Sequence, residues 1–253
     1  MIDQFILSLI AGVFISGTAG FLGSLMLSKK MSLVAGPLGH LALPGIALAL
    51  IYGFNISLGA FPFIILGIFL IWAFERRTKL PMETLTAVVF ATGVAIAFFF
   101  LPIKQAEEAL VGDISNIKLD ETLASIIICF FVLIVCEKIY SKMVLINISE
   151  DLAKTQKISV KKYNLIYLLL IALIVALGVK VVGGLLTAAI VAIPAASARN
   201  FSKNLFQYKL LSLIFGILSS VIGIFISKFS FLPAGPLIIV ISAGIFVVSV
   251  IFK

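Results

Sequence analysis

The only histidine of the chain, His40, has the side chain best suited to bind a metal cation. It lies in the stretch Gly36-Pro-Leu-Gly-His-Leu-Ala-Leu-Pro-Gly45, at or inside an apolar segment, where an ionisable side chain is costly and usually functional. Neutral imidazole is the commonest protein ligand of transition metals. His40 is therefore a candidate contact for a metal cation, weighed evenly against a histidine that only packs in the interior.

Pro44 and Gly45, just beyond this histidine, can interrupt the helix that carries it. Backbone carbonyls freed by such a break commonly face ion sites inside membranes. One histidine cannot form a tight metal site, so further oxygen or sulfur ligands would have to come from neighbouring residues, water or a second subunit.

Motifs of the common catalytic sites are missing from the sequence. No Gly-x-x-x-x-Gly-Lys-Ser/Thr phosphate loop occurs, so any ATP used would have to be bound by another polypeptide. No cluster of carboxylates with histidine or cysteine in the apolar segments suits hydrolysis or redox chemistry. Cys129 and Cys136 lie on one predicted helix, roughly 10 Å of rise apart, too far to form a disulfide, and are expected to fill the core. We therefore expect neither an enzyme nor a bound cofactor.

Composition places the chain in a membrane. Of its 253 residues, 62% are hydrophobic and 12% charged, and its mean hydropathy is +1.27. A soluble domain could not bury so much apolar surface, so lipid must surround most of the side chains. The net charge of +8 does not indicate nucleic-acid binding, because the basic residues form short clusters between apolar runs.

The apolar runs predict an all-α polytopic membrane protein with eight or nine transmembrane helices in a single domain, residues 1–253. The first run follows Asp3 and Gln4 without a basic region, so we expect a retained span rather than a signal peptide. The segment at 183–198 is short and is expected to be broken or re-entrant. The predicted segments are 5–27, 37–53, 56–74, 83–102, 122–139, 163–179, 183–198, 210–228 and 235–252.

Basic residues between these segments predict the orientation. With the N-terminus outside and all nine segments crossing, every basic residue except Lys104, Lys118, Lys180 and Lys228 falls on the cytoplasmic side. The inverted orientation would reverse that excess, which the positive-inside rule disfavours.

Two loops are long enough to dock partners. The outer loop, 103–121, is acidic, with Glu107, Glu108 and Asp113 near its centre. The inner loop, 142–162, contains Ser149 followed by Glu150 and Asp151, a pattern typical of a helix N-cap with acids in the first turn. We therefore expect a short helix over 148–158 at the cytoplasmic surface.

A stripe of small residues follows one face of the first segment. Such a stripe lets another helix approach closely, and we favour helix packing over a direct role in a pathway. Its members recur every four residues: Gly12, Ser16, Gly20 and Ser24.

Several short motifs, taken in their order and spacing over nearly the whole chain, resemble the permease subunit family of zinc, manganese and iron ABC importers. This family is similar in architecture to the cobalamin and siderophore importers. The motifs are Ser28-Lys-Lys-Met-Ser-Leu33, His40-Leu-Ala-Leu-Pro-Gly45, Ala109-Leu-Val-Gly-Asp-Ile114, Val182-Gly-Gly-Leu-Leu-Thr187, Ile193-Pro-Ala-Ala-Ser-Ala198 and Leu232-Pro-Ala-Gly-Pro236.

The resemblance implies a permease of a prokaryotic cell (inner) membrane that moves a divalent metal. Its implied partners are a second permease copy, two cytoplasmic ATPase subunits that bind the ATP, and an extracytoplasmic metal-binding protein. It implies that the 148–158 helix couples to the ATPase through Glu150, Asp151, Leu152 and Ala153. The family typically places an aspartate four residues before the histidine, where this chain has Gly36, so only His40 is carried over as a metal contact.

Three other functions are kept as alternatives. An ABC permease for a metal chelate or vitamin would use the same architecture and leave His40 incidental. A stand-alone ion-gradient carrier or channel needs buried carboxylates or broken-helix ion sites, and mid-span Asp and Glu are absent from the predicted segments. A structural membrane protein without transport activity would be purified without any ATPase partner.

Overall fold

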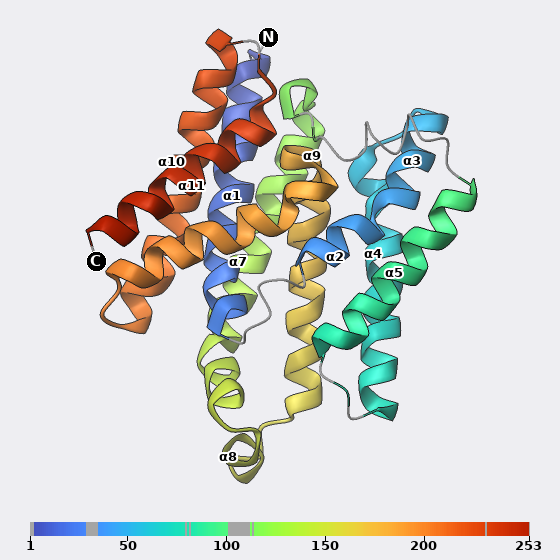
Figure 1. The fold of residues 1–253 in the computed structure, drawn as a ribbon, viewed down its shortest axis with the longest axis vertical. Coiled ribbons are helices and arrows are strands. Elements are labelled where there is room, and N and C mark those ends of the chain that lie inside the picture. Colours follow the sequence, from blue (N-terminus) through green and yellow to red (C-terminus); the bar gives the residue numbers. More distant parts are fainter. Residues whose placement is uncertain are drawn as a thin grey trace.

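The computed structural model describes residues 3–28, 35–78, 80, 82–100, 112, 114–230 and 232–252, and within these ranges the chain is helical, with no strand. The elements are α1 (Gln4–Ser28), α2 (Ala35–Leu41), α3 (Leu43–Tyr52), α4 (Ile56–Arg77), α5 (Met82–Phe100), the 3₁₀ turn η2 (Ile114–Asn116), α7 (Leu119–Ile148), α8 (Glu150–Thr155), α9 (Val160–Phe201), α10 (Leu205–Ser230) and α11 (Ala234–Ile251). Figure 1 shows α9 at the centre of the molecule, and the helices packed on it are α1, α2, α4, α7, α10 and α11.

The prediction of an all-α polytopic membrane protein is confirmed. Each of the predicted segments coincides with helix in the described ranges. By length and composition, 6 of the described helices can cross a membrane: α1, α4, α7, the first part of α9 (Val160–Gly184), α10 and α11. The remaining segments are shorter, namely α2 with α3, the apolar part of α5 (Thr84–Ala95), and the second part of α9 (Leu186–Phe201).

The predicted end of one span was wrong. The segment at 122–139 is part of a 30-residue helix, α7, which continues through Ile148 into the predicted inner loop. Met143 and Ile146 are buried, three residues apart, so an apolar face continues beyond the hydrophobic run and holds the last turns against the protein. The inner loop is therefore shorter than the sequence indicated.

The helix that carries His40 is interrupted, as its proline and glycine predicted. α2 ends at Leu41, and α3 begins at Leu43 with Pro44 in its first turn. Proline fits there because the first turn of a helix needs no backbone donor. The sequence 35–52 thus forms two short helices in place of one span.

α9 has a sharp kink at Gly183, whose φ of 83° and ψ of 166° are non-helical. Only glycine adopts this conformation without strain. The first part rises away from α8, and the second part slants back toward the start of α10 (Figure 1). The kink lies at the first residue of the predicted 183–198 segment, and the remainder of that segment is continuous helix rather than broken.

The small-residue stripe of α1 lies against a matching stripe of α10. Gly12 faces Ser220, Gly20 faces the carbonyl of Ser212, and the carbonyl of Ser16 faces Gly216. An added Cβ on Gly20 would collide with the Ser212 carbonyl oxygen, so the two backbones approach too closely there for larger residues. The fourth stripe residue, Ser24, instead shares a 3.0 Å hydrogen bond with Tyr140 of α7.

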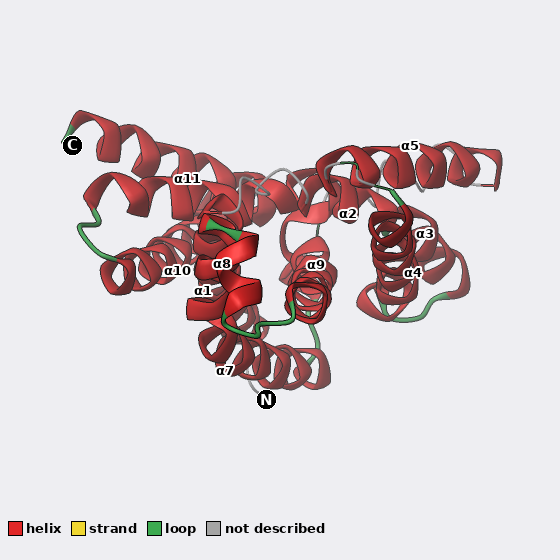
Figure 2. Ribbon diagram, turned by 90° about the horizontal axis from the view of Figure 1, so that it is seen from below, coloured by secondary structure: helices red, strands yellow, loops and turns green. Residues whose placement is uncertain are grey.

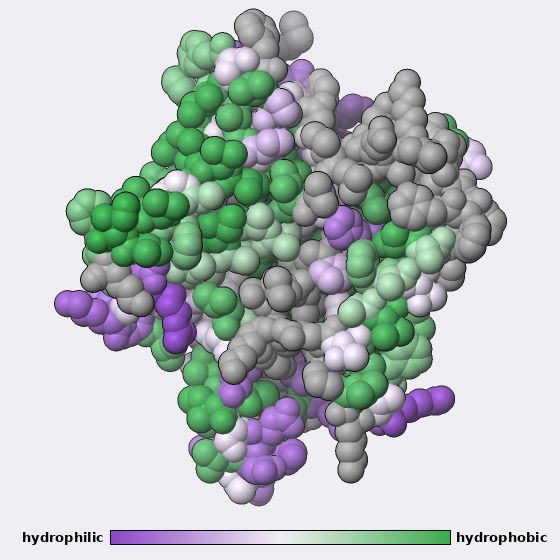
Figure 3. Space-filling model, in the orientation of Figure 1, coloured by the Kyte–Doolittle hydropathy of each residue, from purple (hydrophilic) through white to green (hydrophobic). Residues whose placement is uncertain are grey.

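Polar and apolar surfaces are separated along the long axis. In Figure 3, hydrophilic residues gather at the lower end around α8, and hydrophobic residues cover the flank formed by α10 and α11. Seen from below in Figure 2, α8 lies across that end of the bundle. This distribution fits a multi-pass membrane protein with a polar surface around α8.

Candidate functional site

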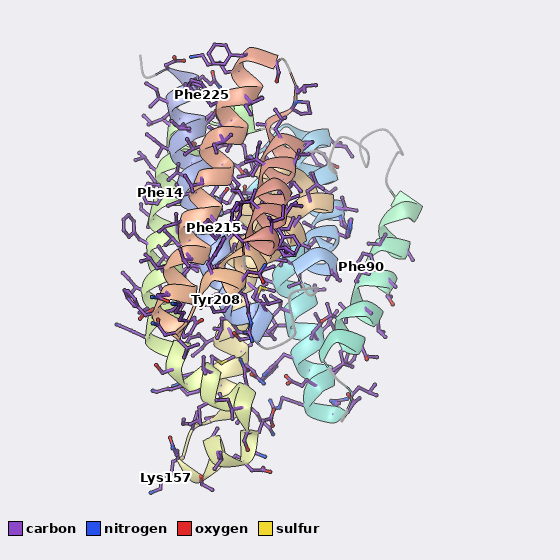
Figure 4. The ribbon with its side chains drawn as sticks, turned by 60° about the vertical axis from the view of Figure 1, so that its left-hand side comes forward. Phe14, Phe90, Lys157, Tyr208, Phe215 and Phe225 are labelled. Atoms are coloured by element: carbon purple, nitrogen blue, oxygen red, sulfur yellow. The ribbon has the colours of Figure 1, made fainter. Side chains whose placement is uncertain are left out.

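His40 is on α2, half-buried, beside the point where two interrupted helices meet. Its ring lies 5.4 Å from that of Phe90, centroid to centroid, at an interplanar angle of 39°. Figure 4 labels Phe90 on α5. Among the described residues, no group of three or more His, Cys, Asp or Glu side chains could hold a metal. His40 thus lies by an aromatic ring, and the described part of the chain provides no preformed cage for a cation around it.

The backbone next to His40 touches the kink of α9. A Cβ added to Gly39 would lie 2.7 Å from the carbonyl oxygen of Gly184 and 3.2 Å from Thr187 Oγ1. Thr187 Oγ1 in turn donates a 2.6 Å hydrogen bond to the carbonyl of Gly183. A movement of α9 about its kink would therefore shift the helix that carries His40. Gly36, where the resembled family has an aspartate, lies one turn before His40 on the same short helix.

A charged cluster, not predicted from the sequence, joins three helices at the end opposite α8. Lys180 of α9 forms an ion pair with Glu121 of α7, and their side chains are only 12% and 10% exposed. Asn55, the N-cap of α4, donates a 2.5 Å hydrogen bond from Nδ2 to the other carboxylate oxygen of Glu121. The Lys118 backbone N–H donates to Glu121 at 3.0 Å. A buried carboxylate is thus satisfied by a cation and two further donors.

One sequence signal could have found this cluster. Lys180 stands alone between two strongly apolar runs, and an ionisable residue inside such a stretch is by default a functional candidate with a partner to be found. The partner was not identifiable, because Glu121 belongs to a distant helix and was assigned to the acidic outer loop.

At the opposite end, α8 forms where a helix over 148–158 was predicted, but it is shorter: it covers Glu150–Thr155, and Ile148 is the last residue of α7. Ser149 caps it, its hydroxyl accepting a 3.3 Å hydrogen bond from the Leu152 N–H. Glu150, Asp151 and Leu152 are exposed, whereas Ala153 is fully buried and packs inside the protein. Figure 4 labels Lys157, just after this helix, at the extreme lower end of the molecule. The exposed face of α8 therefore combines two acids with an apolar side chain, 53% of Leu152 being exposed.

A second ion pair between helices links α10 to α7. Lys209 of α10 contacts both carboxylate oxygens of Glu137 on α7, at 2.6 and 2.8 Å. Its ammonium also lies 4.9 Å from the centroid of the Tyr140 ring, a cation–π arrangement. Cys129 and Cys136 of α7 are buried free thiols, as expected of core residues.

The three acids at the centre of the predicted outer loop, Glu107, Glu108 and Asp113, lie outside the described residues. Its predicted role in receiving a partner protein stays a prediction. From this stretch the structure describes Gly112, the η2 turn and the residues that lead into α7.

Comparison with known proteins gives a consistent match over the whole chain. Residues 1–253 match the ABC 3 transport family. The chain is 27% identical to the manganese import system permease protein ScaB of Streptococcus parasanguinis, over 96% of this chain and 88% of that protein. It is 27% identical to the high-affinity zinc uptake system membrane protein ZnuB of Buchnera aphidicola, over 98% of each. The solved structure of PsaBC from Streptococcus pneumoniae in complex with Fab superposes with a TM-score of 0.83 at 24% identity, covering 98% of this chain and 95% of that one.

Proposed function

Because the chain belongs to the ABC 3 transport family, we propose that it is the membrane-spanning permease subunit of an ATP-driven importer for a divalent transition-metal ion. The match over the full chain carries this proposal. Relatives aligned along almost their whole length are named as manganese and zinc permeases, which favours these two ions over iron as cargo.

The permease supplies the pathway and other chains supply the energy. We propose that this chain is a transport subunit, a single domain over 1–253, with no catalytic site and no bound cofactor of its own. Cytoplasmic ABC ATPase subunits bind and hydrolyse ATP, and a second copy of the permease completes the pathway. An extracytoplasmic metal-binding protein delivers the ion.

His40 is proposed as a transient contact for the moving ion. It belongs to a short helix whose backbone touches the kink of α9, so a change in the kink can present or withdraw the imidazole. A single neutral histidine without a surrounding carboxylate cluster binds a metal weakly. Weak binding suits a passage site, since the ion must leave as readily as it enters.

Removing this contact tests the proposed function. We expect His40→Ala to reduce uptake of one metal selectively, because a ligand is lost while the helices stay packed. The measurement is cellular zinc, manganese and iron content under separate limitation, in strains with the chain, without it, and with His40→Ala. Val240→Ala, at a position 65% exposed on α11, is the control and should take up metal normally.

Each outcome decides a different point. If deletion of the chain leaves all three metal contents unchanged, the metal-import assignment is wrong, and a chelate or vitamin becomes the better cargo. If deletion lowers one metal but His40→Ala does not, the function stands and His40 has no part in the pathway.

The exposed face of α8 is proposed to seat in the ATPase. Its surface presents Glu150, Asp151 and Leu152, and the buried Ala153 packs against the rest of the permease. Because short connections join α8 to α7 and α9, a displacement of α8 by the ATPase would move these two helices. Apolar contact edged by charge is the usual composition of a protein interface.

Charge reversal on this face is expected to uncouple the importer. In the double variant Glu150→Lys with Asp151→Lys, like charges would oppose any basic groups on the ATPase, and ATPase co-purification or metal-dependent ATP hydrolysis should fall severalfold. The neutral pair Glu150→Gln with Asp151→Asn is the graded control and should lose less. Normal association and coupling in the reversed variant would refute the docking assignment.

A further inference from the structure

α4 and α7 border a furrow whose floor is α9. Seen from below, the two helices lie on different sides of α9 (Figure 2). Between them is a cavity of about 370 Å³, floored by Leu173, Ala176 and Leu177 and walled by Phe61 of α4 and Ile128 of α7. The floor residues follow the spacing of one helical face, so the furrow runs along α9. Its surface below the outer end is apolar.

The outer end of the same furrow is charged with both signs. Lys180 and Glu121 line it together with Asn55, and Asp120, which is exposed, lines it beside them. These residues lie at the starts of α4 and α7 and near the kink of α9, the ends farthest from α8. In a protein that spans the bilayer, this is the level of the outer headgroups, where charged groups contact lipid polar moieties.

We infer that the furrow binds one phospholipid of the outer leaflet with a zwitterionic, amine-bearing headgroup. Its acyl chain lies along Leu173, Ala176 and Leu177, and its ammonium group faces the exposed carboxylate of Asp120, beside the Lys180–Glu121 pair. The lipid phosphate lies on the side of Lys180. An anionic headgroup without an amine would leave Asp120 opposed by negative charge, so the charge pattern selects for the zwitterion.

A second groove shows why the charged end matters. A larger cavity of about 650 Å³ lies among α3, α4 and α5, lined by residues such as Pro44, Phe63, Phe74 and Val88. No charged residue lines it within the described part of the chain. This groove can accept acyl chains, but its apolar lining cannot distinguish one lipid headgroup from another. It therefore serves as a reference site with which lipid binding in the furrow is compared.

The bound lipid would join α4 to α7 below the Asn55–Glu121 hydrogen bond. The two helices are linked at their outer ends by that bond, and the cavity separates them farther in. A lipid that fills this space would hold α4 and α7 at a fixed distance on the surface of α9, and its loss would loosen the helices on either side of the kinked segment.

Native mass spectrometry of the purified full chain tests the inference. The probes are phosphatidylethanolamine and phosphatidylglycerol with identical acyl chains, added to delipidated protein. We expect the chain to retain one phosphatidylethanolamine at activation energies that strip phosphatidylglycerol. Ala124→Phe, which fills the furrow from an exposed position of α7, should weaken this retention about tenfold, a change of about 1.4 kcal/mol. Val88→Phe in the reference groove should not.

Two further variants keep the test decisive. Asp120→Asn should retain lipid but lose the preference for the amine-bearing headgroup. Leu58→Trp narrows the furrow from α4, at a position 68% exposed, and replaces Ala124→Phe if that variant does not fold. Equal retention of the two lipids by the unmodified chain would overturn the headgroup assignment, and unchanged retention in the filled variants would overturn the furrow as the binding place.

Discussion

Replacing Gly183 by alanine is expected to destabilise the fold, because the kink of α9 holds this residue in a left-handed backbone conformation. At its φ of 83° and ψ of 166°, an L side chain collides with its own backbone. Such strain costs about 1–3 kcal/mol. The kink is also crowded, because a Cβ added to Gly235 would lie 2.9 Å from Val182 Cα, so the kink has little room to relax. The thermal unfolding midpoint in detergent should fall clearly, and transport should fall with it.

Gly244→Ala is the matched control for this prediction. Gly244 lies in α11, and an added Cβ there meets nothing within 4 Å. Alanine favours a helix by about 0.8–1.0 kcal/mol over glycine, so this variant should be unchanged or slightly more stable. Equal unfolding midpoints for the two variants would mean that alanine is not strained at position 183, and the kink would then not depend on glycine.

Much of the architecture could be predicted from the apolar runs and from the proline and glycine residues that interrupt them. Long apolar runs predicted every described span because lipid demands continuous helices. Pro44 and Gly45 indicated the interruption between α2 and α3, since proline lacks a donor. The break in α9 was expected from the short length of the 183–198 segment, and not from Gly183, although glycine alone tolerates the dihedral angles found there. The end of α7 could not be predicted in the same way, because Met143 and Ile146 are buried by protein beyond the apolar run.

The candidate site was only partly accessible from sequence. His40 was conspicuous as the only histidine, and Ser149 with the acids after it matched a known cap pattern. The cluster of Asn55, Glu121 and Lys180 was not, because its members are separated by 59 or more positions along the chain and only the packing of α4 and α7 on α9 brings them together. Long-range pairs of this kind need the tertiary fold.

Breaking the Lys180–Glu121 pair is expected to have the second large effect. Lys180→Met leaves the Glu121 carboxylate buried with only its hydrogen-bond donors, and Glu121→Gln leaves the largely buried Lys180 ammonium without its ion-pair partner. Removing one partner of a buried ion pair typically costs about 3–5 kcal/mol, whereas replacing both by uncharged residues is often close to neutral. Each single variant should therefore unfold at a much lower temperature than the double variant.

A double-mutant cycle in detergent measures this coupling, with the exposed pair Lys154–Asp151 as reference. That pair has a similar chemistry, 3.1 Å between Nζ and Oδ1, but its side chains are 61% and 93% exposed, so water screens it and Lys154→Met should change the unfolding midpoint little. Additive effects of Lys180→Met and Glu121→Gln would show that the two charges do not interact, and each would then owe its position to other contacts. Strong coupling would show that this pair holds α7 to α9, three residues before the kink that α2 contacts.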